Sequence, residues 1–138
     1  MQFKYLVPCL AILGAAGPGR AETISAAPVA VDVEALKTGQ LPAAGTRDEA
    51  DSCAAETAFM LIALLQTGKL KADDMAKLAE PMALWSKRAA AFRPMDPKAY
   101  GSDKAVADAT MAMVKIDFDT NVALEKACMQ RLLPDGGK

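Results

Sequence analysis

The residues of this chain that could do chemistry are few, and the types that are missing exclude most kinds of catalytic site. The sequence contains no histidine, which is the side chain that most often serves as a general base or metal ligand near neutral pH. No serine begins a Ser-x-x-Lys pair, and no GxSxG, phosphate-binding loop or dinucleotide-binding glycine pattern occurs. Methionines are soft ligands for Cu(I), but filling gaps in a core with few aromatic residues explains them better. The sequence therefore predicts a protein that is not an enzyme and holds no cofactor and no metal.

Acidic side chains remain as candidates for acid–base chemistry. Most local acidic pairs lie at expected helix starts, where carboxylates interact favourably with the helix dipole. Glu56 and Asp117 differ, because Glu56 stands alone in an apolar segment and Asp117 falls on the apolar arc of another expected helix. A buried acid needs a partner. We expect each to lie at an edge or to be satisfied by a neighbour, such as Thr110 or Asn121 for Asp117, and a pocket converging on either would indicate catalysis.

Two cysteines, Cys53 and Cys128, are predicted to form a disulfide. The third, Cys9, lies in the apolar amino-terminal segment. A redox or metal site would need a CxxC pair or a nearby histidine, and the sequence has neither. Closing a loop of about 75 residues contributes roughly 4 kcal/mol in the chain-entropy model. That is a large share of the stability of a small domain.

The amino terminus predicts export. Residues 1–4 carry one positive charge, and the apolar run that follows ends near Ala16. Gly19-Arg20-Ala21 supplies the small residues of a signal-peptidase site before Glu22. The run is shorter than the about 20 apolar residues that span a bilayer. We therefore expect residues 1–21 to be a cleaved signal peptide and the mature chain to be periplasmic, where a cysteine pair is oxidised.

The charge of the mature chain limits its partners. Cleavage removes Lys4 and Arg20, so 14 of the 16 basic residues remain against 17 acidic ones, for a formal net charge of −3. No basic cluster is left that could follow a phosphate backbone. Nucleic acid is therefore not an expected partner, and no second apolar stretch predicts an integral membrane segment. Another envelope protein is the expected partner.

Apolar periodicity predicts an all-α fold, a small disulfide-stapled bundle of three main helices within a helical domain at 47–133. The central helix, 47–65, is apolar on nearly every side, which is typical of a helix surrounded by others. The second, 73–92, carries one core-facing stripe and contains Pro81, which predicts a kink. The third is expected to run unbroken from Asp103 to about Leu132, roughly 45 Å.

The remaining segments are expected to be less regular. Residues 22–46 are predicted as a flexible lead with a short fourth helix near 31–37, and residues 134–138 as a disordered tail. Prolines at 94 and 97 favour an extended connection over 93–101. Such a connection lets the last helix run antiparallel to the central one, as the disulfide requires. That register places Glu56 level with Glu125, and Leu64 level with Asp117.

The last predicted helix carries a second apolar stripe, formed by Met111, Phe118, Val122 and Met129. One interpretation is that the segment near 29–36, or the loop near Met95 and Tyr100, covers this stripe. The other is that it stays exposed as an adaptable protein-binding patch with Phe118 at its centre, because exposed methionine and aromatic patches mark protein contacts.

The layout resembles that of uncharacterised small two-cysteine helical envelope proteins of proteobacteria. Cys53-Ala-Ala opening an apolar helix, Trp85 and Phe92 in the second, and Lys126-Ala-Cys128 closing the last carry the resemblance. The resemblance implies no known function. The plan is also similar to that of periplasmic acid-stress chaperones, which are shorter and have closer cysteines. We therefore expect a non-catalytic interaction protein (accessory subunit, inhibitor or immunity-type binder), with a periplasmic chaperone or stress-response protein as the alternative.

Overall fold

The computed structural model describes residues 29–93 and 95–133, and every element in that part of the chain is helical. The elements are α2 (Val33–Leu36), α3 (Arg47–Leu65), α4 (Ala72–Ala91), α5 (Pro97–Tyr100), α6 (Lys104–Ala112), the short 3-10 helix η2 (Met113–Lys115) and α7 (Phe118–Gln130). The predicted all-α class is confirmed. The predicted signal peptide and carboxy-terminal tail lie outside the described residues.

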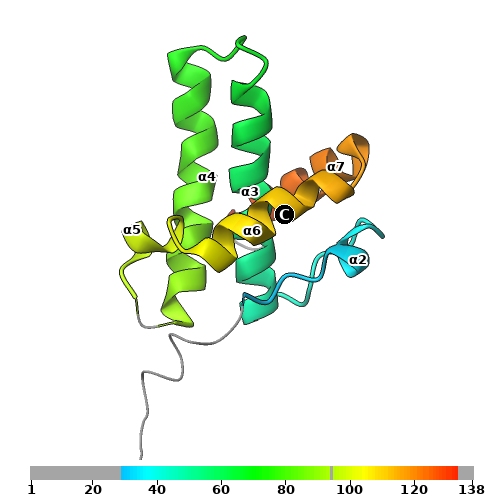
Figure 1. Ribbon diagram of the computed structural model, residues 1–138, viewed down its shortest axis with the longest axis vertical. Helices are drawn as coiled ribbons and strands as arrows, with labels where there is room; N and C mark the ends of the chain where they lie inside the picture. Colours follow the sequence, from blue (N-terminus) through cyan, green and yellow to red (C-terminus); the bar gives the residue numbers. More distant parts are fainter. Residues whose placement is uncertain (1–28, 94, 134–138) are drawn as a thin grey trace, which may run out of the picture.

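Helices α3 and α4 form a long hairpin that organises the rest of the molecule. Thr46 caps α3 by accepting a hydrogen bond from the backbone N–H of Glu49 at 3.1 Å. Gly68, with φ +68°, provides the left-handed residue shortly after α3 ends. Helix α4 continues through Pro81 as one helix. Figure 1 shows α6 and α7 lying obliquely across α3, while the turn of the hairpin projects beyond them.

The expectation of one unbroken helix from 103 to 132 is wrong. The chain leaves the helical conformation at Ile116, whose φ and ψ are −95° and 138°. Asp117 then caps α7 by accepting a hydrogen bond from the Thr120 N–H at 2.9 Å. The Asn121 side chain donates to the carbonyls of Met113 and Ile116 at 3.2 and 3.0 Å. A strong N-cap residue and a side chain that satisfies the freed carbonyls therefore stabilise this corner.

Two segments expected to be irregular are ordered against the helices. The connection predicted to be extended contains α5, with Pro97 in its first turn and Asp96 capping it, a position where the missing N–H of proline costs nothing. The described part of the predicted flexible lead, 29–46, packs on the core, because Leu36 is 2% exposed. Val29, Val31 and Leu41 also pack against core clusters. Its helix is α2, shorter than the expected span at 31–37.

The disulfide between Cys53 and Cys128 is confirmed, with a Cα–Cα distance of 5.6 Å, within the usual range for such bonds. It joins α3 to α7 beside Trp85, which is fully buried. The Trp85 indole N–H donates to the Cys128 carbonyl at 3.1 Å. One point of the core therefore connects α3, α4 and α7.

Replacing both Cys53 and Cys128 with alanine should lower the free energy of unfolding by about 4 kcal/mol, because the bond closes a long loop and restricts the unfolded chain. Urea unfolding of the oxidised protein and the double variant measures the difference. The reduced wild-type protein should match the variant. Equal stability of oxidised and reduced protein would contradict this account of the staple.

Candidate binding groove

An apolar groove of about 540 Å³ lies between the α3–α4 hairpin and the α5–α6 segment. Its lining residues are Ala54, Ala58, Leu61 and Ile62 of α3; Met82, Ala83 and Ser86 of α4; and Pro97, Lys98, Tyr100, Gly101, Val106, Ala107, Thr110 and Met111 from α5, α6 and the turn between them. Lys98 is the one charged side chain in this lining. The volume falls within the roughly 300–1,000 Å³ typical of ligand sites.

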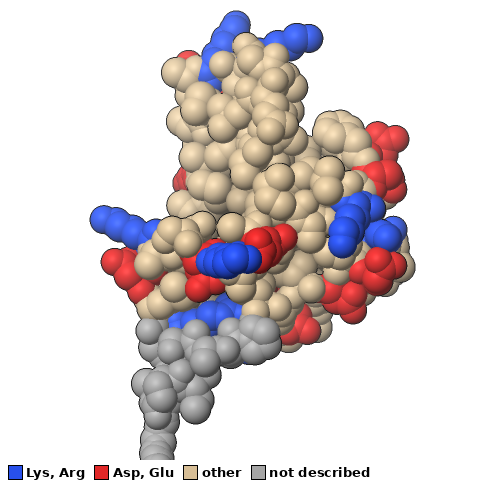
Figure 2. All heavy atoms as spheres, viewed as in Figure 1, with Lys and Arg blue, Asp and Glu red and all other residues tan. Residues whose placement is uncertain are grey.

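The groove exists because residues 58–65 of α3 are all apolar but are not covered on every side. In its amino-terminal half, residues 50–57 are all buried. Farther along, Ile62 is 36% and Leu65 is 41% exposed. Alanines on the floor, such as Ala54 and Ala58, fill little of the space. Figure 2 shows a broad face above α6 on which neither acidic nor basic side chains gather.

The polar atoms of the lining are largely engaged elsewhere. The Thr110 hydroxyl donates to the Val106 carbonyl at 2.9 Å. The Tyr100 hydroxyl donates to Asp51 at 2.6 Å, so the ring borders the groove while the hydroxyl is held outside it. Such a surface favours binding of an apolar group, and it offers no arrangement of nucleophile and base.

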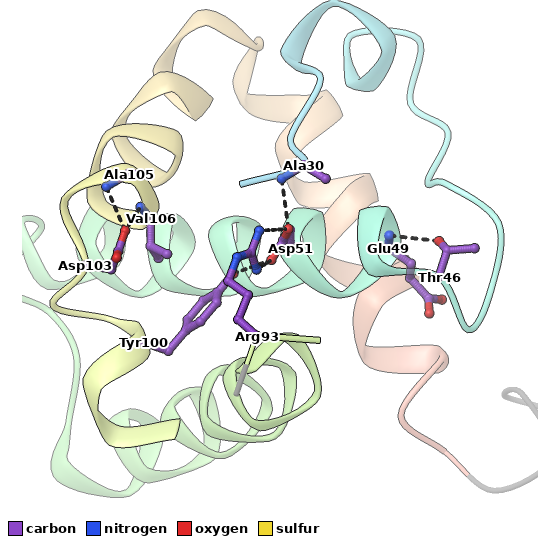
Figure 3. A network of polar contacts seen from close by, with 9 residues as sticks. All are labelled: Ala30, Thr46, Glu49, Asp51, Arg93, Tyr100, Asp103, Ala105 and Val106. Atoms are coloured by element: carbon purple, nitrogen blue, oxygen red, sulfur yellow. Dashed lines mark hydrogen bonds and ion pairs between the residues drawn. The ribbon is translucent and has the colours of Figure 1, made fainter. Parts of the chain in front are cut away.

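A buried ionic network fixes the wall of the groove. The Asp51 carboxylate is fully buried and accepts hydrogen bonds from both terminal nitrogens of Arg93 at 2.8 Å, from the Tyr100 hydroxyl, and from the Ala30 N–H at 2.8 Å. Figure 3 shows these groups converging from α3, the end of α4, α5 and the amino-terminal segment. The network therefore holds α5 against the start of the hairpin.

The charges in this network follow from its hydrogen bonds. Burial would raise the pKa of Asp51, but the hydrogen bonds from Arg93, Tyr100 and Ala30 outweigh it, so the pKa lies below its usual value. The pKa of Arg93 is raised, chiefly by its hydrogen bond to Asp51. Burial raises the pKa of Tyr100. Asp51 is therefore a carboxylate and Tyr100 a neutral donor at neutral pH.

A second buried acidic group lies at the contact between α3 and α7. Glu56 is 1% and Glu125 is 7% exposed, and none of their four carboxyl oxygens has a hydrogen-bond partner in the described residues. Burial raises the pKa of Glu56 to about 8, with a further contribution from the charge of Glu125. Burial likewise raises the pKa of Glu125 to about 7. Neither residue lines the groove, so the pair is not placed to act on a molecule bound there.

Asp117, the other candidate for a buried acid, lies elsewhere. It is exposed at the first turn of α7, and hydrogen bonds from the side chain and backbone of Thr120 lower its pKa. Asp117 therefore lies at an exposed edge, as expected, because the helix that would have buried it is broken there. Glu56 departs from the same expectation, since it is buried without a hydrogen-bond partner in the described residues. Because the predicted last helix is broken at Ile116, the register that placed Asp117 level with Leu64 in one continuous helix does not hold.

The four residues of the predicted second stripe are divided between two helices. Met111 belongs to α6, where it lines the groove and is 51% exposed. Phe118, Val122 and Met129 belong to α7, and Phe118 is 58% and Met129 39% exposed. The break at Ile116 therefore leaves no single stripe on one helix. The groove itself was not predicted from the sequence.

Comparison with known proteins identifies no relative: no family model, no curated protein and no solved structure matches this chain. Within residues 29–93 and 95–133, no helix combines the length and the hydropathy needed to cross a membrane. The same part of the chain holds no group of three or more metal-binding side chains.

Substituting Asp51 with asparagine should destabilise the fold by about 3–5 kcal/mol, because it removes the carboxylate from a buried ion pair. The matched control is Asp108→Asn, which removes the carboxylate of an exposed pair with Lys104 and should leave stability unchanged within error. Urea unfolding at neutral pH measures both. Equal effects of the two substitutions would contradict the role given to Asp51.

Proposed function

We propose that the mature protein is a non-catalytic interaction protein of the periplasm, and that its groove binds the apolar face of an amphipathic helix from another envelope protein. The observation that carries the proposal is the incomplete cover of α3. A helix apolar on all sides belongs inside a helical assembly, and the carboxy-terminal half of α3 has an open side at the groove. A partner would supply the missing cover.

The shape and charge of the groove favour a helix as the occupant. Helices α3 and α4 form the floor and α6 forms one wall, which leaves a place beside the hairpin like that of the next helix in a bundle. Alanines at 54, 58, 83 and 107 allow a close approach of backbone to backbone. Recognition of this kind uses apolar anchors spaced three and four residues apart. Lys98 at the rim favours an acidic residue near one end of the partner helix.

The signal peptide predicted at residues 1–21 and the disulfide support the periplasm as the compartment. A cysteine pair that closes a large loop is typical of proteins that fold in an oxidising environment, and the pair is bonded here. Within the envelope, an accessory subunit, an inhibitor or an immunity-type binder would each need a surface of this kind. A chaperone would bind many unfolded chains in the same groove, whereas an accessory subunit, an inhibitor or an immunity-type binder would bind one partner. The number of different proteins bound therefore distinguishes these classes.

Filling the groove should abolish partner binding. Ala107 lines the groove and Ala105 does not, although both are exposed on α6. The variant Ala107→Trp should lose most of the enhanced fluorescence of a bound apolar dye and should no longer capture its partner from a periplasmic extract. The control variant Ala105→Trp should behave like the wild type in both assays, and both variants should keep the wild-type thermal midpoint.

Three outcomes separate the classes. Loss of one stoichiometric partner in Ala107→Trp alone supports the proposed function. Capture of many unrelated denatured proteins by the wild type, again lost in Ala107→Trp, would replace it with a chaperone. Identical capture by Ala107→Trp and Ala105→Trp would overturn the assignment of the groove as the binding site.

A further inference from the structure

The contact between α3 and α7 contains two acids where a helical core normally has apolar side chains. Glu56 and Glu125 each lie three residues from the half-cystine of their own helix. The charge of Glu125 acts on Glu56, so the two carboxyls lie near each other across the interface between α3 and α7. Both are buried, and neither has a hydrogen-bond partner in the described residues.

Among residues 29–93 and 95–133, no basic side chain compensates the charge of the pair. Helices α4, α6, α7 and η2 pack most extensively against α3, and α2 joins them through the core cluster that contains Leu36 and Ala55. The other charged side chains of these elements lie partly or fully at the surface: Glu34 and Lys37 of α2; Asp73, Asp74, Lys77, Glu80, Lys87 and Arg88 of α4; Lys104 and Asp108 of α6; Lys115 of η2; Asp119 and Lys126 of α7. Of all these groups, Glu125 is the one whose charge acts on Glu56. The two other buried acids of α3 have basic partners, since Asp51 binds Arg93 and Glu49 binds Arg131.

We propose that Glu56 and Glu125 form a pH-operated latch between α3 and α7, which holds the two helices together while the carboxyls are neutral and separates them when both ionise. A neutral pair can stay buried at this contact, because it carries no charge that needs hydration. Two adjacent carboxylates cannot, because they repel each other and each has lost its hydration. The disulfide, one helical turn away, keeps α7 tethered when the latch opens.

The direction of the pH effect follows from the two protonation states. In the unfolded chain both carboxyls titrate near their ordinary pKa of 4.5, whereas in the folded protein the values are about 8 for Glu56 and about 7 for Glu125. Folding therefore takes up protons between these values. The stabilising effect of the closed latch is complete below pH 4.5 and is lost as the pH rises through 7 to 8. Acidification should thus tighten this fold.

The chain carries its own probe of the latch, because Trp85 is its one tryptophan. Its indole is fully buried and bonded to the Cys128 carbonyl of α7. Displacement of α7 should expose this indole to water and shift its emission to longer wavelength. The probe reports on the native protein with its disulfide intact and needs no denaturant.

The test compares the oxidised wild type with Glu56→Gln/Glu125→Gln and with the control Glu80→Gln, which removes an exposed acid of α4. Between about pH 5 and pH 9 the wild type and the control should show a red shift of Trp85 emission. Their folding equilibrium constant from urea unfolding should fall at least about 100-fold, since each unit of pKa difference is a factor of ten. In the double variant both changes should be lost, and it should be more stable than the wild type at pH 9.

A flat wild-type profile between pH 5 and pH 9 would overturn the proposal, as would the same profile in the wild type and the double variant. Stability that rises with pH would also overturn it. If the substitutions prevent folding, amide hydrogen exchange of the wild-type protein still tests whether α7 is released at high pH. Protection in α7, corrected for the intrinsic effect of pH, must then fall above pH 7 while protection in the middle of the α3–α4 hairpin is kept.

Discussion

The buried carboxylate of Asp51 is the interaction on which the arrangement of this protein most depends. It accepts hydrogen bonds from three separate segments, namely the backbone at Ala30, the guanidinium of Arg93 and the hydroxyl of Tyr100. Those segments also pack apolar side chains on the core, such as Val29 and the Tyr100 ring, and the charge-assisted network fixes their position against the hairpin. Because Tyr100 also borders the groove, the same carboxylate that orders the fold sets the distance between the groove's floor and its wall.

The two polar sites of the core are built in opposite ways. At Asp51 the charge is matched by Arg93, which leaves a permanent ion pair. At Glu56 and Glu125 no such match exists, so this contact is favourable only while protons remain bound. The first site anchors the wall of the groove and the second joins α3 to α7 next to the disulfide. The Asp51–Arg93 pair thus holds the start of the α3–α4 hairpin at any pH near neutrality, whereas the attachment of α7 depends on pH.

The sequence predicted the helical class, the disulfide and the hairpin, because these depend on local periodicity, turn residues and cysteine number. It failed where long-range contacts decide. Asp117, with Thr120 three residues later, is a local signal of a helix N-cap. The apolar periodicity continues on both sides of it, so the sequence predicted one unbroken helix. Asp51 lies among the acids of an expected helix start, and nothing nearby in the sequence reveals that Arg93 and Tyr100 fold back onto it. The groove likewise could not be predicted, because its lining comes from four separate elements that only the folded chain brings together.

We propose that a partner helix lies on the open side of α3, and site-specific photo-crosslinking in the periplasm tests this placement most directly. Ser86 lines the groove, whereas its neighbour Lys87 is exposed and lies outside the lining. A photoreactive amino acid at position 86 should give one dominant crosslinked envelope protein, joined through an amphipathic helical segment, and the same group at position 87 should not. Equal crosslinking from both positions, or none from position 86 while the protein is folded and exported, would contradict the account.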